Sequence, residues 1–183
     1  VRNCDVSGFA VGIILWGTQN STIEGNTTHN NVGGEGGAGI AFGGESTNII
    51  VRNNVSTDNA SGGIHVHSDG NTVEGNTVND NGDWGIRIGA ESTVTGNTLR
   101  NNVAKRNGKN GIHLDTAAET TITGNTLEDN GLHGLAAYQS QVLTVTGNTS
   151  SNNGVGGDEG HGMTIQETGG SVFADNTASG NLV

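Results

Sequence analysis

The chain contains no proline, one cysteine and few large apolar or basic side chains. Among its 183 residues, aromatic residues make up 3%, and Lys and Arg together number seven. The single cysteine, Cys4, excludes an internal disulfide framework. The sequence has no apolar stretch of the roughly 18 residues that a spanning helix needs, so it predicts no insertion into a membrane.

Acidic residues outnumber basic ones by 18 to 7, which gives a formal net charge of −11. Nucleic-acid binding requires clustered Lys and Arg that contact phosphates, so we expect no nucleic-acid partner. An acidic surface suits bound cations, with calcium as the cofactor to consider, or it serves only to keep the protein soluble. The sequence leaves both interpretations open.

Glycine and asparagine are abundant and recur in a repeat. The chain has 33 glycines, and its repeated unit is an apolar residue, two spacers, Asn and usually Thr. Low hydrophobicity with high net charge is typical of disorder. Here, however, the apolar residues recur at fixed places, as in repeat proteins that bury a thin continuous core between units. The repeat anchors are Cys4, Asn26, Asn54, Asn76, Asn97, Asn125, Asn148 and Asn176.

Each repeat also contains a short alternating motif, as in Gly63-Ile64-His65-Val66. Alternation with period two and β-branched residues predict short strands, while Asn and Gly predict the turns between them. About three such strands per repeat close into a solenoid. We therefore predict an all-β fold, a right-handed single-stranded parallel β-helix of about seven coils. It forms one domain over residues 1–183, which we expect to be an excerpt of a longer chain.

The recurring Asn predicts a ladder of side-chain amides along the axis. Stacked amides donate and accept hydrogen bonds between coils, and they satisfy turn carbonyls that are otherwise costly to bury. We assign the anchors from Asn26 to Asn176 to this structural role. A second Asn follows in each coil, at Asn31, Asn59, Asn81, Asn102, Asn130, Asn153 and Asn181.

The motif Ile/Val-x-Gly-Asn-Thr with Asn-Gly-x-x-Gly-Ile resembles the β-helix repeats of the pectate-lyase-like superfamily. The resemblance covers nearly the whole chain, with Ile23–Thr27 and Val73–Thr77 as examples. That superfamily includes polysaccharide lyases, mannuronan epimerases and secreted carbohydrate-binding proteins. The resemblance implies an extracellular or cell-surface protein whose partner is a polysaccharide or a cell-surface polymer. Because the same scaffold carries many functions, activity has to be argued from the site.

Lengthened turns border the Gly-Ile strand. Extra residues are predicted before it at Val32–Ala38, Val103–Asn110 and Gly154–His161, and insertions in solenoids often border the binding face. Alternation turns every second residue of the strand outward. The outward residues form a first column of Ile14, Ala41, His65, Arg87, His113, Ala136 and Thr164, and a second of Trp16, Gly43, His67, Gly89, Asp115, Tyr138 and Gln166.

These two columns contain the candidate catalytic residues His65, Arg87, His113, Asp115 and Tyr138. On neighbouring coils they stand about 4.8 Å apart. Arg binds the carboxylate of an acidic sugar, and His or Tyr abstracts and returns the adjacent proton, which is the chemistry of lysis or epimerisation. Aromatic side chains stack on sugar rings. The candidate substrate-binding residues are Trp16, His67, Gln166, His133 and His161.

Other interpretations of the same columns stay open. Polar residues on an exposed sheet need no function, and two histidines two residues apart make a weak metal site, so we assign no metal ligands. Mannuronan epimerases carry Asp-Pro-His-Glu after such a strand. This chain has Asp115-Thr116-Ala117-Ala118, so only Asp115 matches and Ala117 stands where the catalytic His is expected. The sequence therefore leaves open whether the chain is an enzyme.

Two functions without catalysis are alternatives. One is ice binding through a flat threonine array, formed by Thr22, Thr72, Thr93, Thr95, Thr121, Thr123, Thr144 and Thr146. Against it, Glu24, Arg52 and Glu74 interrupt one column, and Thr is in any case a good exposed strand residue. The other is a structural surface, adhesin or filament module that self-associates end to end through its open coils.

Overall fold

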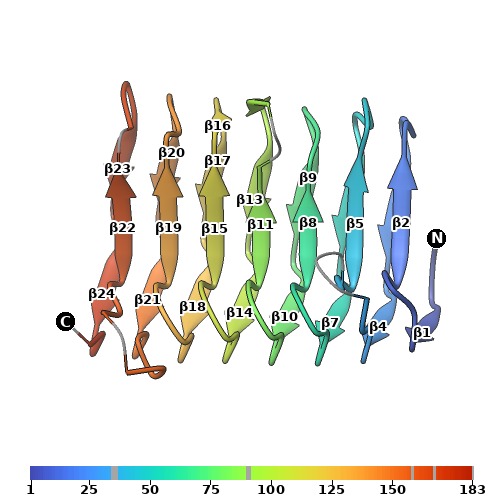
Figure 1. Ribbon diagram of the computed structural model, residues 1–183. Helices are drawn as coiled ribbons and strands as arrows, with labels where there is room; N and C mark the ends of the chain where they lie inside the picture. Colours follow the sequence, from blue (N-terminus) through green and yellow to red (C-terminus); the bar gives the residue numbers. More distant parts are fainter. Residues whose placement is uncertain (34–36, 90–91, 158, 167, 183) are drawn as a thin grey trace.

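The computed structural model describes residues 1–33, 37–89, 92–157, 159–166 and 168–182. These residues form strands and turns, and among them no helix is long and apolar enough to span a membrane. The coils stack along one axis, with the N-terminal coil at the right of Figure 1 and the C-terminal coil at the left. All strand pairs are parallel. The predicted parallel β-helix is confirmed.

Three long sheets run along the axis. The one that carries the outward columns, here called the Gly-Ile sheet, consists of β2 (Ile13–Trp16), β5 (Ile40–Gly43), β8 (Ile64–Val66), β11 (Ile86–Ile88), β15 (Ile112–Asp115), β19 (Leu135–Tyr138) and β22 (Met163–Gln166). The second sheet consists of β3 (Thr22–Glu24), β6 (Ile50–Arg52), β9 (Thr72–Glu74), β13 (Thr98–Arg100), β17 (Thr121–Thr123), β20 (Thr144–Thr146) and β23 (Val172–Ala174).

The third sheet closes each coil. It consists of β1 (Asp5–Ser7), β4 (Thr27–His29), β7 (Val55–Thr57), β10 (Thr77–Asn79), β14 (Val103–Lys105), β18 (Thr126–Glu128), β21 (Thr149–Ser151) and β24 (Thr177–Ser179). A two-stranded pair, β12 (Val94–Thr95) and β16 (Ala117–Ala118), lies between the Gly-Ile and second sheets in sequence.

The core is a narrow apolar stack that runs between the three sheets. In β8 and β11 the inward residues Ile64, Val66, Ile86 and Ile88 are fully buried. Each such side chain contributes roughly 1.5–3 kcal/mol through burial. Glycine precedes these strands because coils approach closely there: a Cβ on Gly85 would lie 2.5 Å from the Gly111 carbonyl oxygen.

Two asparagine ladders run along the turns. In the first ladder, the Nδ2 of Asn54 donates to Asn76 Oδ1 at 3.0 Å and to the Ile23 carbonyl at 3.0 Å. The same Oδ1 accepts the Asn54 backbone N–H at 2.9 Å. Every amide is thus shared between coils, as the sequence predicted. The first ladder is Asn26, Asn54, Asn76, Asn102, Asn125, Asn148 and Asn176, and the second is Asn31, Asn59, Asn81, Asn107, Asn130, Asn153 and Asn181.

The register predicted from the sequence is wrong in the coil that contains β11, β13 and β14, here called the fourth coil. Asn102 occupies the first ladder in place of Asn97, and Asn107 occupies the second in place of Asn102. The reason is apolar stacking, since Leu99 pairs with Val73 in the preceding coil and with Ile122 in the following one. Thr95-Gly96-Asn97 matches the repeat motif but belongs to the turn before β13.

The same shift moves one lengthened turn. Val103–Asn110 is not an insertion, because β14 and Asn107 follow the regular spacing, and the extra residues of this coil lie between β11 and β13 instead. Of the other two predicted insertions, residues 34–36 and 158 fall outside the described residues.

The threonine array also changes with the corrected register. Thr98, rather than Thr93, aligns with Thr72 and Thr121 on the second sheet, and Arg100, rather than Thr95, aligns with Thr123. The next column holds Glu24, Arg52, Glu74 and Arg100 joined in ion pairs. Charged side chains therefore occupy four of the seven positions in one of the two columns that an ice-binding array would need to keep flat and uncharged.

Candidate functional site

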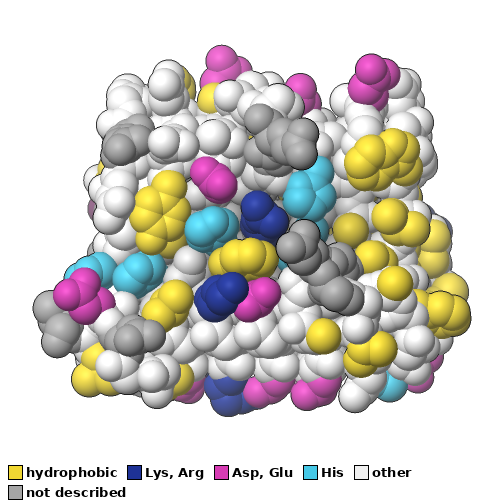
Figure 2. All heavy atoms as spheres, in the orientation of Figure 1, with side chains coloured by type: hydrophobic (Ala, Val, Ile, Leu, Met, Phe, Trp, Pro, Cys, Tyr) yellow, Lys and Arg dark blue, Asp and Glu magenta, His cyan; other side chains and the backbone are white. Residues whose placement is uncertain are grey.

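The outward residues of the Gly-Ile sheet align as the sequence predicts. His65 of β8 pairs with Arg87 of β11, and Arg87 pairs with His113 of β15. In the next column Asp115 of β15 pairs with Tyr138 of β19, which in turn pairs with Gln166 of β22. Histidine and basic side chains gather in the middle of this face, over β8, β11 and β15 (Figure 2). We call His65, His67, Arg87, His113 and Tyr138, with Trp84, the central cluster.

Arg87 differs from every other basic side chain of the protein. All seven Lys and Arg lie in the described ranges, and six of them form ion pairs: Arg2 and Arg52 with Glu24, Arg100 with Glu74, Lys105 with Glu128, Arg106 with Asp80, and Lys109 with Asp83. Arg87 has no carboxylate partner among the described residues. Its Nε is buried without a hydrogen-bond partner. The site therefore contains one half-buried positive charge that forms no ion pair within the described part of the chain.

Trp84, in the turn that leads into β11, contacts the Arg87 guanidinium. The Arg87 guanidinium carbon lies 4.8 Å from the centre of the Trp84 ring, and the His113 ring stacks on Trp84 at 5.4 Å. Lys109 Nζ lies 4.6 Å from the same ring and is neutralised by Asp83 at 2.8 Å. Cation–π contacts of this kind hold a guanidinium in place without cancelling its charge.

The histidines of the central cluster are neutral at physiological pH. Burial, together with the positive charge of Arg87, lowers the pKa of His113 to about 4. Burial, the neighbouring His67 and Arg87 lower the pKa of His65 to about 3. Burial also lowers the pKa of His67, although its hydrogen bond to Gly89 opposes the shift. Neutral imidazoles are the forms that accept or donate one proton in general acid–base catalysis.

Hydrogen bonds assign different tautomers to His113 and His67. The Asn110 Oδ1 accepts the His133 backbone N–H at 3.0 Å, which directs its NH2 group to His113 Nδ1, also at 3.0 Å. His113 Nδ1 is therefore an acceptor, and Nε2 carries the hydrogen. In His67, Nδ1 donates to the Gly89 carbonyl, so Nε2 holds a lone pair. Nε2 of His67 can therefore accept a proton, whereas Nε2 of His113 can donate a hydrogen bond.

Tyr138 and Asp115 complete the cluster on its C-terminal side. The Tyr138 ring lies 5.6 Å from the His113 ring, and partial burial raises the pKa of its hydroxyl. Tyr138 is consequently a neutral hydrogen-bond donor at pH 7. Asp115 is half-buried one coil before it.

His65 is less accessible than an outward strand position suggests. Its side chain is only 4% exposed, and Nε2 is buried without a partner. Its ring lies 5.8 Å from His67 and 6.1 Å from Trp84. The catalytic role predicted for His65 stays a prediction, and the half-buried His67 is the more accessible of the two side chains.

The remaining predicted substrate-binding residues lie at the margins. Trp16 is 72% exposed on β2, and Gln166 is exposed on β22. His133 and His161 precede β19 and β22, with their rings stacked at 5.1 Å. The His161 backbone N–H donates to His133 Nδ1 at 3.1 Å. The structure thus brings five of the ten predicted residues into one cluster, with Asp115 beside it, and leaves Trp16, Gln166, His133 and His161 around it.

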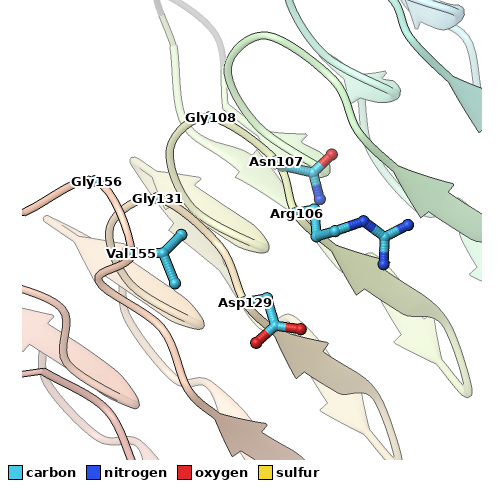
Figure 3. Close-up of a pocket in the computed structure, with 7 residues that line it drawn as sticks. All are labelled: Arg106, Asn107, Gly108, Asp129, Gly131, Val155 and Gly156. Carbon is cyan, nitrogen blue, oxygen red and sulfur yellow. The ribbon is translucent and has the colours of Figure 1, made fainter.

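One hollow in the surface lies beside the central cluster, and another lies away from it. A hollow of about 330 Å³ is lined by His67, Ser68, Asp69 and Thr93. Another, of about 470 Å³, is lined by Arg106, Asp129 and Val155 at the turns between the third and Gly-Ile sheets (Figure 3). Arg106 is already paired with Asp80 at 2.7 Å, whereas the first hollow adjoins His67 of the central cluster.

Across the described parts of the chain, no group of three or more His, Cys, Asp or Glu side chains is arranged to hold a metal ion.

The sequence matches a protein family described as the right handed beta helix region, over residues 1–104 and 89–183. The two matches together cover the chain. It belongs to the right-handed β-helix family. Comparison with curated protein sequences gives no significant match.

Several solved structures have the same β-helix fold as this chain. The A-module of the mannuronan C-5 epimerase AlgE4 from Azotobacter vinelandii superposes with a TM-score of 0.81 at 18% identity, covering 98% of this chain and 53% of that one. The periplasmic alginate epimerase AlgG gives 0.73 at 18%, covering 95% and 49%. The Dettilon tailspike protein gives 0.69 at 18%, covering 92% and 36%. At these identities the likeness shows the fold. This β-helix spans about half the length of the epimerases, or less in the tailspike.

Three residues are missing from the sequence-based candidates: Trp84 of the central cluster, and Lys109 and Asn110 beside it. The signal for Trp84 was its rarity, since the chain has two Trp. No pattern in the sequence indicates that Asn110 fixes the tautomer of His113, because that depends on a contact with the next coil.

Proposed function

We propose that this β-helix binds an acidic polysaccharide across the Gly-Ile sheet and transfers a proton at a uronate residue, as a lyase or an epimerase does. The observation that carries the proposal is Arg87. Among the residues that the structure describes, it is the one basic side chain without a carboxylate partner, and it lies among neutral proton-carrying rings. A uronate carboxylate would supply the missing partner.

Binding of a carboxylate to Arg87 has a clear energetic basis. Charge-assisted bonds between guanidinium and carboxylate are short and bidentate, and their strength rises when water is excluded. Burial of Arg87 Nε has already removed part of its hydration. The same contact stabilises the negative charge that develops when the proton beside the carboxylate is removed.

The proton carriers have distinct roles. His67, with its Nε2 lone pair, removes the proton from the carbon next to the carboxylate. His113 Nε2–H or the Tyr138 hydroxyl donates a proton. Donation to the leaving glycosidic oxygen, with the carbon–oxygen bond breaking and a double bond forming, gives lysis. Return of a proton to the opposite face of the same carbon gives epimerisation.

The solved relatives support this substrate class. Two are named as alginate or mannuronan epimerases, and another similar structure is the enzymatically active domain of the bacteriophage CBA120 tailspike protein 2. One epimerase is named as periplasmic. We extend to this chain a polysaccharide substrate and an extracellular or cell-surface location. Ala117 in place of the expected His means that catalysis here rests on the central cluster.

The test uses the protein with a panel of uronate-containing polysaccharides, both homopolymers and polymers with neutral sugars between the uronates. Ultraviolet absorbance detects unsaturated ends, and NMR detects epimerised residues. We expect one polymer to bind and to be converted, with conversion lost in His67→Gln and in whichever of His113→Gln and Tyr138→Phe removes the proton donor. Arg100→Met, on the second sheet, is the matched control. Absence of both binding and conversion across the panel contradicts the proposal and favours a structural module.

A further inference from the structure

Resting on the proposed function, we infer that the substrate is a heteropolysaccharide in which each uronate is flanked by neutral sugars, and not a polymer of consecutive uronates. The juxtaposition that carries this inference is a single cation, without an ion pair among the described residues, in the middle of an otherwise uncharged or acidic sheet face.

The face on either side of Arg87 offers no second positive charge. Toward the N-terminus the outward residues are Ile14, Trp16, Ala41 and Gly43, and toward the C-terminus they are Ala136, Tyr138, Thr164 and Gln166. All seven Lys and Arg of the sequence are accounted for, and the one nearest to Arg87, Lys109, is neutralised by Asp83 at 2.8 Å. His65 and His113 are neutral above about pH 4 and carry no compensating charge.

Distance prevents Arg87 from serving several carboxylates. Coils are spaced by about 4.8 Å, so groups two coils away lie roughly 10 Å from the guanidinium. That exceeds the Debye length of about 8 Å at physiological ionic strength. A carboxylate bound there would experience a protein of net charge −11 and, beside Tyr138, the Asp115 carboxylate of the neighbouring strand, with little attraction from Arg87. Each uronate that lies two or more coils from Arg87 would therefore weaken binding.

Neutral sugars, in contrast, would meet exposed aromatic side chains two and three coils away from Arg87. Trp16, 72% exposed, lies three coils before Arg87, and Tyr138 lies two coils after it. Aromatic faces bind the apolar faces of sugar rings without requiring charge. Ile14, 61% exposed beside Trp16, extends the apolar surface. The face thus presents one anion site between two surfaces for uncharged rings.

The experiment compares two sets of oligosaccharides of equal length by calorimetric titration into the intact chain. One set alternates uronate with neutral sugars, in several stereochemical types, and the other contains only uronates, also in several types. We expect the best alternating oligosaccharide to bind at least tenfold more tightly than the best oligouronate. Chemical reduction of its carboxyl groups, or Arg87→Met, should abolish most of that binding, whereas Arg100→Met should not.

Salt gives a second readout that does not depend on any variant. Raising the salt concentration should narrow the gap between the two sets, because it screens the repulsion of the extra carboxylates. If an oligouronate binds as tightly as the best alternating oligosaccharide, or more tightly, and does so through Arg87, the inference is overturned while the proposed function stands. If no acidic oligosaccharide of either set binds the folded protein, both are overturned.

Discussion

The first asparagine ladder and the outward columns of the Gly-Ile sheet both stack side chains once per coil, yet they are built in opposite ways. The ladder repeats one residue from Asn26 to Asn176, and each amide binds the next at 2.9–3.0 Å. The first outward column changes residue from each coil to the next, from Ile14 to Thr164.

Hydrogen-bond satisfaction separates the two regions further. Four buried side-chain polar atoms of the described residues have no partner: His65 Nε2, Arg87 Nε, Thr164 Oγ1 and Asn97 Nδ2. Three of them belong to the first outward column and none to a ladder. A buried polar atom without a partner costs roughly 1–3 kcal/mol. The scaffold is thus marked by identical residues that hydrogen-bond from coil to coil. The outward column is marked by residues that differ between coils and include buried polar atoms without partners.

The sharpest test of the scaffold compares Asn102→Ala with Asn97→Ala. Loss of the Asn102 amide removes the acceptor of the Asn76 backbone N–H, one of the two acceptors of the Asn76 NH2 group, and the NH2 donor to the Val73 carbonyl. We therefore expect a loss of roughly 3–5 kcal/mol in the free energy of unfolding. Asn97 only accepts the Asn71 N–H, so its removal should cost roughly 1–2 kcal/mol. Urea denaturation measures both. Equal losses, or the reverse order, would show that the register in this coil is incorrect.

Acid should destabilise the protein through the site and not through the ladders. The pKa values of His65 and His113 are depressed to about 3 and about 4, so below pH 6.5 the unfolded chain binds protons that the folded chain does not. Stability is therefore present at neutral pH and falls as the pH is lowered from about 6.5 toward 4, by about 1.4 kcal/mol per pH unit for each histidine.

Urea denaturation at pH 7, 6 and 5 measures this slope. His65→Gln should reduce it by the contribution of one histidine, whereas Asn97→Ala should leave it unchanged. A slope unaffected by His65→Gln would contradict the burial of a neutral imidazole at this position.

A smaller effect is expected from Asn110→Asp. A carboxylate facing Nδ1 would stabilise a proton there, so the pKa of His113 should rise from about 4 and Nε2 should lose its hydrogen. Nitrogen-15 NMR of the imidazole reports both the tautomer and the titration. His67, which hydrogen-bonds to Gly89 and not to Asn110, is the internal control. An Nδ1–H tautomer of His113 already present in the natural protein would refute the assignment.

The smallest effect is expected on the second sheet. Arg100 and Glu74 form a half-exposed ion pair, and such pairs contribute about 0–1 kcal/mol. Arg100→Met should therefore lower the free energy of unfolding by less than about 1 kcal/mol. Thermal unfolding followed by circular dichroism measures the change, and a loss comparable with that of Asn102→Ala would show that surface charges help to hold the coils.

Most of the fold could be predicted because every coil shows the same two signals. Apolar and other residues alternate along the strands, and Asn and Gly mark the turns. The error in the fourth coil has a physical cause. Thr95-Gly96-Asn97-Thr98 and Arg100-Asn101-Asn102-Val103 both place Asn after a short strand, and only the burial of Leu99 against Val73 and Ile122 selects the second.

The site could be predicted in its composition but not in its chemistry. Alternation placed His65, Arg87 and His113 on neighbouring strands, as observed. It could not show that the ring of His65 is buried, or that Arg87 is the cation left unpaired. Both depend on side chains from the turns, such as Trp84 and Lys109, whose positions follow from packing between coils.

The central claim is that Arg87 is the anion site of this β-helix. The most direct measurement is the affinity of uronate-containing oligosaccharides for the natural protein, Arg87→Met and Arg100→Met, with folding verified by circular dichroism. We predict that Arg87→Met weakens binding at least tenfold, whereas Arg100→Met binds like the natural protein. Unchanged affinity in a folded Arg87→Met protein, or an equal loss in both variants, would contradict the account.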